Sequence, residues 1–147
     1  MKALTLAQPW ATLVAAGEKK IETRSWRTRY RGPIAIHAAK SYPAWARELA
    51  LKPPFAAAVH RIFHGEAPTF PLGAVVAVAE LVECVRIDAL PLSWAPQSGS
   101  AEHAFGDYSP GRFMFRLEAI LPLTDIIPTR GALGIWEWDA PWEEAHP

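Results

Sequence analysis

The residues from 73 to 87 form the longest extended pattern in the chain and constrain its fold more than any other segment. This stretch is rich in valine, whose branched side chain favours strands. Alternate positions place three valines and Cys84 on one face, with Glu80 as the acid among them. We predict one long strand here. Glu80 then either sits at a cleft or pairs with a buried base such as Arg24.

The rest of the chain divides into short segments of two kinds. Alternation of side-chain character predicts strands over residues 1–6, 20–25, 34–39, 113–120 and 133–136. Helical spacing and turn residues predict short helices over residues 9–16, 41–50 and 56–63. Residues 90–111 are rich in Pro, Ser and Gly, which predicts an irregular surface excursion, and residues 139–147 form an acidic tail that we expect to be mobile.

Length and composition predict one domain over residues 1–147, because half of the residues are hydrophobic and can form one core. The only cysteine, Cys84, excludes an internal disulfide; we expect a buried thiol and a cytoplasmic protein. No apolar run reaches the length of a membrane span, so we expect a soluble protein without a membrane partner. The histidines lack further ligands at metal-binding spacing, and we predict no metal and no cofactor.

Charge is distributed unevenly although the net charge is zero. Residues 1–65 contain 11 Lys and Arg against 3 acids, whereas residues 66–147 contain 4 against 12. Two outcomes are open: the halves neutralise each other in the folded protein, or the basic half forms a surface for a phosphate-bearing partner.

The segment from Gly17 to Arg24 contains the densest polar chemistry. Gly17 stands where a left-handed helix cap is expected, and a strand then follows. Alternation along that strand projects Glu22 and Arg24 side by side. Either they form an exposed ion pair, or Arg24 offers its planar fork to a carboxylate or phosphate while Glu22 and Lys19 supply further charge.

Aromatic and basic residues alternate from Trp26 to Gly32, as in surfaces that bind single-stranded nucleic acid. Trp26 and Tyr30 can equally cover the core from a loop. His37, on the following strand, is either a hydrogen-bonded structural group or part of the polar cluster.

Five ordered blocks of the chain together resemble the ASCH domain family. They are Gln8-Pro9-Trp10-Ala11, the Gly17-x-Lys19-x-x-Glu22-x-Arg24 string, Trp26-x-Thr28-x-Tyr30-Arg31-Gly32, Ile36 to Lys40, and the pair of closing segments 105–113 and 131–136. The resemblance implies an α+β fold, with a small PUA-like β-barrel of five to six strands and two or three short helices packed on it. The strand over 73–87 is long enough to bend around such a barrel.

The resemblance also implies a role in RNA metabolism or regulation, as an RNA- or nucleotide-binding module. The alternative is an enzyme: an amidohydrolase acting on acetylcytidine, or a ribonuclease. In the amidohydrolase branch a threonine nucleophile works with a lysine; Lys19 matches that lysine, but Glu22 stands at the threonine position. Alternation sends the adjacent Thr23 to the other face of the strand, so Lys19 and Glu22 would have to serve as acid and base.

The predicted partner is therefore RNA or another phosphate-containing ligand, and protein partners are unspecified. Lys19 and Glu22 are the catalytic candidates. The ligand-binding candidates are Lys19, Glu22, Arg24, Trp10, Trp26, Tyr30, His37, Lys40, Asp107 and Arg112.

Overall fold

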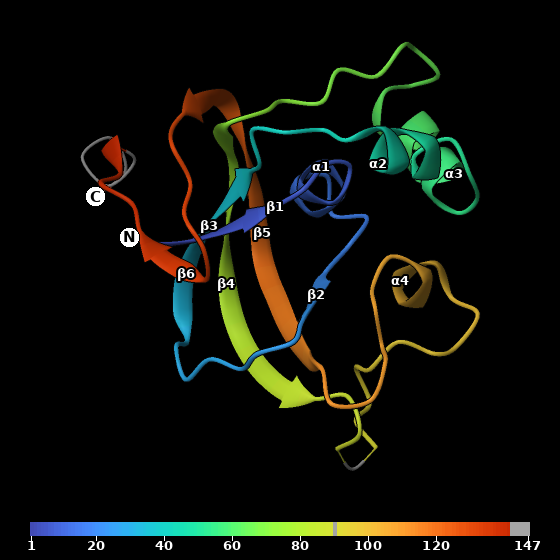
Figure 1. The fold of residues 1–147 in the computed structure, drawn as a ribbon, viewed down its shortest axis with the longest axis vertical. Helices are drawn as coiled ribbons and strands as arrows, with labels where there is room; N and C mark the ends of the chain where they lie inside the picture. Colours follow the sequence, from blue (N-terminus) through green and yellow to red (C-terminus); the bar gives the residue numbers. More distant parts are fainter. Residues whose placement is uncertain (90, 142–147) are drawn as a thin grey trace.

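The computed structural model of the chain describes residues 1–89 and 91–141. These residues form one six-stranded sheet and four short helices (Figure 1). The strands are β1 (Lys2–Leu6), β2 (Ile21–Arg24), β3 (Gly32–Ala38), β4 (Ala74–Arg86), β5 (Phe113–Pro128) and β6 (Ile135–Glu137). The helices are α1 (Trp10–Ala15), α2 (Ala44–Leu49), α3 (Phe55–Ile62) and α4 (Ala101–Ala104). Most of the predicted tail, residues 142–147, lies outside the described residues.

The sheet is mixed and strongly curled, with the strand order β2-β5-β4-β3-β1-β6. Among the strands of the described residues, only β1 and β3 are parallel neighbours, and the other pairs are antiparallel. The long strands β4 and β5 bend together (Figure 1), and their pairing shifts register at three places. Such irregularities increase local bending. The predicted α+β fold and the long strand over 73–87 are thus confirmed, the sheet forming half of a barrel.

The main core fills the concave side of this sheet, where α1 packs against β3 and β4. Leu4, Ile36 and Phe115 are completely buried there, together with Val14 from α1. Burying a side chain of this size stabilises a fold by roughly 1.5–3 kcal/mol. The core therefore fixes α1, and with it the segment that follows.

Gly17 ends α1 with a φ of +77°, which confirms the predicted left-handed cap. The Gly17 N–H donates to the carbonyl of Val14, and the N–H groups of Glu18 and Lys19 both donate to the carbonyl of Leu13. These bonds turn the chain sharply, so Lys19 points back into the protein at the start of β2.

Two expectations need correction, and one of the two alternatives for Glu80 is excluded. The segment over 90–111, predicted to be irregular, contains the helix α4. Ser100 caps this helix, because its hydroxyl accepts a hydrogen bond from the N–H of His103. The Pro- and Ser-rich composition of the segment gave no indication of a helix. Cys84 is free but only half-buried, because it lies near the end of β4 where the core thins. Glu80 is not the partner of Arg24, whose carboxylate partner is Glu22.

Candidate functional site

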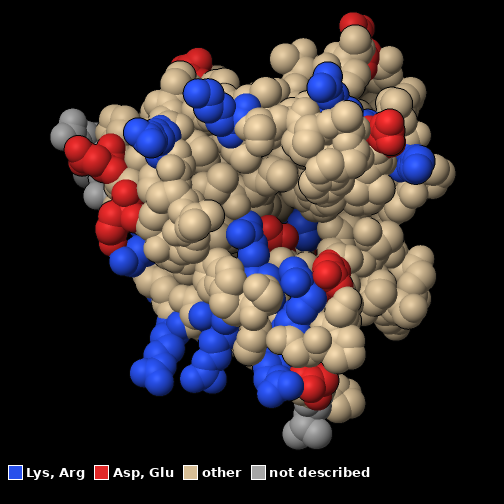
Figure 2. Space-filling view, viewed as in Figure 1, with Lys and Arg blue, Asp and Glu red and all other residues tan. Residues whose placement is uncertain are grey.

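A cleft of about 490 Å³ opens between the ends of β1 and β2, the start of α1 and the end of α4, and we call it the Glu22 cleft. Figure 2 shows a hollow in the middle of this face with acidic and basic groups inside it. The cleft is lined by Thr5, Ala7, Trp10, Glu22, Thr23, Arg24, Leu49, Phe55 and residues 104–107.

Glu22 bridges two cations at this cleft. Its Oε1 lies 3.5 Å from Nζ of Lys19, and its Oε2 lies 3.0 Å from Nη2 of Arg24. The N–H of Thr23 also donates to Oε1, at 3.0 Å. The predicted side-by-side placement of Glu22 and Arg24 is confirmed, and the pair is mostly buried rather than a solvent-facing surface pair.

The charge state of Glu22 follows from these neighbours. Burial alone would raise the pKa of its carboxyl, but the charges of Lys19 and Arg24 and the Thr23 N–H outweigh burial and hold the pKa below the ordinary value. Glu22 is therefore ionised at neutral pH, and the three side chains carry one net positive charge.

The two cations have different access to the cleft. Lys19 is completely buried, and its ammonium donates to the carbonyl of Ile21 besides facing Glu22. Arg24 is part-exposed; its Nε and Nη2 bind Glu22, and Nη2 also donates to the carbonyl of Thr5 at 2.7 Å. Its Nη1 makes no hydrogen bond to any residue of the described ranges. Arg24 is consequently the cation that a ligand can reach.

Among the predicted aromatic residues, Trp10 alone lines the Glu22 cleft. Its indole N–H donates to the carbonyl of Phe105 at 2.7 Å, and its ring contacts Phe55 edge to face. Trp26 packs edge to face on Phe115, and Tyr30 also packs against the core. The structure does not bring these two residues to the cleft, and their role in ligand binding stays a prediction.

The loop after α4 closes one side of the cleft. Asp107 lies at the rim, and its N–H donates to Oγ1 of Thr23 at 3.0 Å. Arg112 donates to the carbonyls of Asp107 and Thr23, so it fastens this loop to β2 rather than lining the cleft. Thr23 borders the cleft together with Glu22, contrary to the expected separation, because β2 is an edge strand and the loop folds over it.

His37 and Lys40 lie in a second hollow, of about 1000 Å³, which we call the Arg130 groove. His37 is buried, with Nδ1 3.1 Å from the Thr5 hydroxyl and Nε2 2.8 Å from the carbonyl of Thr129. The carbonyl can only accept, so Nε2 carries a proton. These bonds describe a structural histidine, whereas Lys40 is exposed at the edge of the groove.

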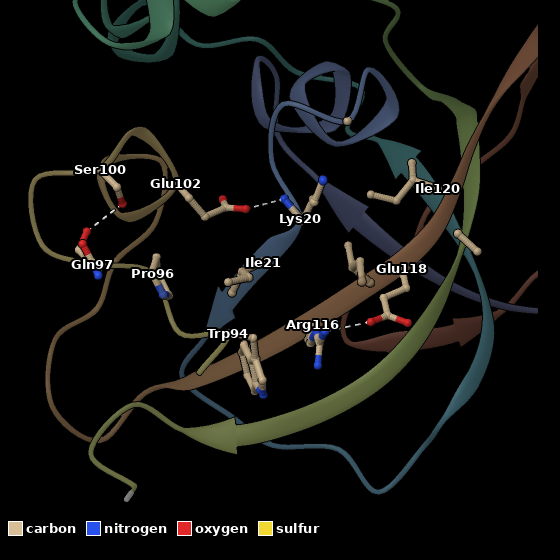
Figure 3. A pocket seen from close by; sticks show the side chains of 13 residues that line it. Lys20, Ile21, Trp94, Pro96, Gln97, Ser100, Glu102, Arg116, Glu118 and Ile120 are labelled. Carbon is tan, nitrogen blue, oxygen red and sulfur yellow. Dashed lines mark hydrogen bonds and ion pairs between the residues drawn. The ribbon is translucent and has the colours of Figure 1, made fainter. Parts of the chain in front are cut away.

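Two polar residues near the site were not predicted. Figure 3 shows Glu102 of α4 reaching across a third hollow to Lys20, whose N–H donates to its Oε1 at 2.6 Å. Burial raises the pKa of Glu102, and its Oε2 is buried without a partner among the described residues. Burial likewise raises the pKa of Tyr108, whose hydroxyl is also buried and unpartnered there. Spacing gave no signal for Glu102, which is 82 residues from Lys20.

Two further findings concern the described ranges only. Within residues 1–89 and 91–141, no three His, Cys, Asp or Glu side chains gather in a way that could hold a metal ion. In the same part of the chain, every helix is too short or too polar to cross a membrane.

Comparisons with family models, with curated proteins and with solved structures all find similar proteins. A model of the ASCH domain family matches residues 4–114. Activating signal cointegrator 1 from Homo sapiens and from Mus musculus is 31% identical over 86 residues, which is 56% of this chain but only 14% of either relative. The crystal structure of a Tyr-to-Phe variant of the ASCH protein from Zymomonas mobilis superposes with a TM-score of 0.56 at 16% identity, covering 98% of this chain and 93% of that one.

Proposed function

The chain belongs to the ASCH domain family, whose members are generally PUA-like and RNA-binding, and we propose that it binds RNA or a nucleotide in the Glu22 cleft. The proposal places Arg24 and Glu22 against the polar groups of the ligand and Trp10 against its base. A cytoplasmic location is part of this proposal, and the free thiol of Cys84 supports it.

The observation that carries the proposal is the pairing of Glu22 with Arg24 at the cleft. The guanidinium is already oriented by Glu22 and by the carbonyl of Thr5, so little side-chain freedom is lost when a ligand binds. Arg24 offers its Nη1 donors to a phosphate or base acceptor, whereas the oxygens of Glu22 already accept from Thr23 and Arg24 and face Lys19, so Glu22 acts by holding the guanidinium in place. Trp10, with its indole fixed, adds a rigid aromatic surface.

The distribution of charge supports an anionic partner. Of the ion pairs between described side chains, only Lys2 with Glu137 joins the basic half to the acidic half. Direct ion pairing between the two halves is therefore sparse. Arg27, Arg29 and Arg31 are exposed, and basic side chains extend from the lower edge of the face in Figure 2. Such a field raises the rate at which a polyanion meets the cleft.

Binding of a fluorescent single-stranded RNA, measured by anisotropy, tests the proposal. Arg24→Lys keeps the charge but loses the planar fork, and we expect the affinity to fall about tenfold, since a hydrogen bond to a charged group contributes roughly 1.5–3 kcal/mol. Arg61→Lys is the matched control, because Arg61 holds Glu18 in a similar pair on the surface. Equal affinities for both variants would place RNA binding elsewhere.

A hydrolase is the second candidate, and the burial of Lys19 beside Glu22 favours it, because buried lysine and carboxylate pairs occur where proton transfer is catalysed. Because its pKa is lowered, Glu22 is ionised at neutral pH and would accept a proton rather than donate one, as a weak base. Incubation with acetylcytidine and with short RNAs tests this candidate, with Glu22→Gln as the comparison. No turnover, or equal turnover by the variant, eliminates it.

A further inference from the structure

We propose that the Glu22 cleft and the Arg130 groove form one continuous track, in which a single RNA strand places one nucleotide in the cleft and the phosphates of its neighbour in the groove. The inference rests on the proposed function and extends it: the natural ligand becomes a strand of several nucleotides rather than a free mononucleotide.

Thr5 joins the two hollows. It lines both of them, and its two polar groups serve one hollow each. Its carbonyl accepts the hydrogen bond from Arg24 in the cleft, and its hydroxyl contacts His37 in the groove. The indole N–H of Trp136 donates to the same hydroxyl at 3.1 Å. A ligand that passes over Thr5 therefore meets a fixed surface from one hollow to the next.

The groove has the chemistry of a phosphate site. None of the described residues that line it is acidic. Lys40 and Arg130 are both exposed on it, and neither has an ion-pair partner within residues 1–89 and 91–141. Figure 2 shows basic side chains along the upper edge of the face, over the ends of β3 and β5. The hollow of Figure 3 is different, because it is lined by both acids and bases, and its Arg116 is already paired with Glu118.

The groove also offers apolar edges and a rigid floor. Leu133 is 98% exposed and Leu72 is 44% exposed, which provides surface for a ribose or a base. At the floor, both ring nitrogens of His37 are fixed by hydrogen bonds. Gly131 lies so close that an added Cβ would stand 2.6 Å from Cε1 of His37. The floor is thus tightly packed beneath the two cations.

Two cations beside apolar edges could also suit an acidic peptide, but the cleft at the other end of the track disfavours that partner. The fixed indole of Trp10 lines that cleft and gives a base a surface on which to stack, whereas Asp and Glu side chains have no ring to place there. One strand that carries both phosphates and bases satisfies the groove and the cleft together.

Titration calorimetry with uridine monophosphate, a uridine trinucleotide and a uridine hexanucleotide tests the inference. We expect affinity to rise with length. The double variant Lys40→Gln with Arg130→Gln should lose this gain while its affinity for the mononucleotide stays unchanged. The slope of log affinity against log salt for the hexanucleotide should fall by about 1.4, for two phosphate contacts on a single strand.

The matched control is Lys52→Gln with Arg86→Gln, which removes the same charge from exposed positions outside both hollows. Circular dichroism establishes that both double variants are folded. If the mononucleotide binds and the longer RNAs gain nothing, or if the control loses as much as the groove variant, the inference is wrong and the proposed function stands. If no RNA of any length binds, or if only an acidic peptide binds, both are wrong.

Discussion

Glu22 and Arg24 lie side by side on β2, with 3.0 Å between Oε2 and Nη2. The other oxygen of the same carboxylate faces the buried ammonium of Lys19. One acid therefore has two functions: it compensates a charge that water cannot reach, and it orients a charge that a ligand can reach. Stability and binding are consequently coupled at this residue.

Removal of the Glu22 carboxylate should strongly destabilise the fold. Glu22→Ala leaves Lys19 buried without a counter-charge, and breaking a buried pair in this way costs about 3–5 kcal/mol. Urea unfolding measures the cost. Adding Lys19→Met should recover much of this cost, because the apolar methionine side chain needs no counter-charge. If the double variant loses as much stability as the two single variants lose in total, Lys19 and Glu22 are not energetically coupled.

The stabilisation by Glu22 should depend on pH with a definite sign. Its pKa is lowered in the folded protein, so its contribution is fully present above the unfolded value of about 4.3 and disappears as the pH falls through the folded pKa. The stability difference between the wild type and Glu22→Gln, from unfolding curves between pH 2 and pH 7, should shrink below about pH 4. A difference that stays constant across this range would show that Glu22 acts by packing alone.

Glu102 should show the opposite sign. Burial raises its pKa, so the ionised form destabilises the fold at neutral pH. Glu102→Gln keeps an oxygen for the N–H of Lys20 and removes the charge, and its melting temperature should exceed that of the wild type at pH 7. The gain should vanish below pH 4, where the wild-type carboxyl is protonated. A variant less stable at pH 7 would indicate that the charge itself is needed.

Local patterns predicted much of the fold and part of the site, because local geometry determines those parts. Gly17 ends a helix, and Glu22 and Arg24 share one side of a strand; both follow from spacing of a few residues. Contacts between distant segments left no such pattern. Glu102 binds the main chain of Lys20 from across the sequence, and the side chain of Lys19 is buried by the turn after α1. The sequence pattern around Trp26 and Tyr30 is the same whether their side chains cover the core or stack on a ligand. Only the packing in the structure shows that they lie against the core.

The contact between Gly131 and His37 should make the floor of the Arg130 groove sensitive to one methyl group. An added Cβ would lie 2.6 Å from His37 and 2.8 Å from the Thr5 hydroxyl, so Gly131→Ala should cost about 1–3 kcal/mol of stability. Thermal unfolding gives the cost. In a background with both His37→Ala and Thr5→Ala, where the ring and the hydroxyl are absent, the same substitution should cost much less; equal costs in both backgrounds would exclude these contacts as the cause.

Photo-crosslinking tests the central claim most directly, because it reports where RNA lies on the folded protein. A short single-stranded RNA with one 4-thiouridine is irradiated with the wild-type protein, and mass spectrometry identifies the modified peptide. We predict crosslinks to Trp10 and to the segment from Glu22 to Arg24, and their loss in Arg24→Lys. Crosslinks confined to Arg27, Arg29 and Arg31, unchanged in that variant, would contradict a ligand in the Glu22 cleft.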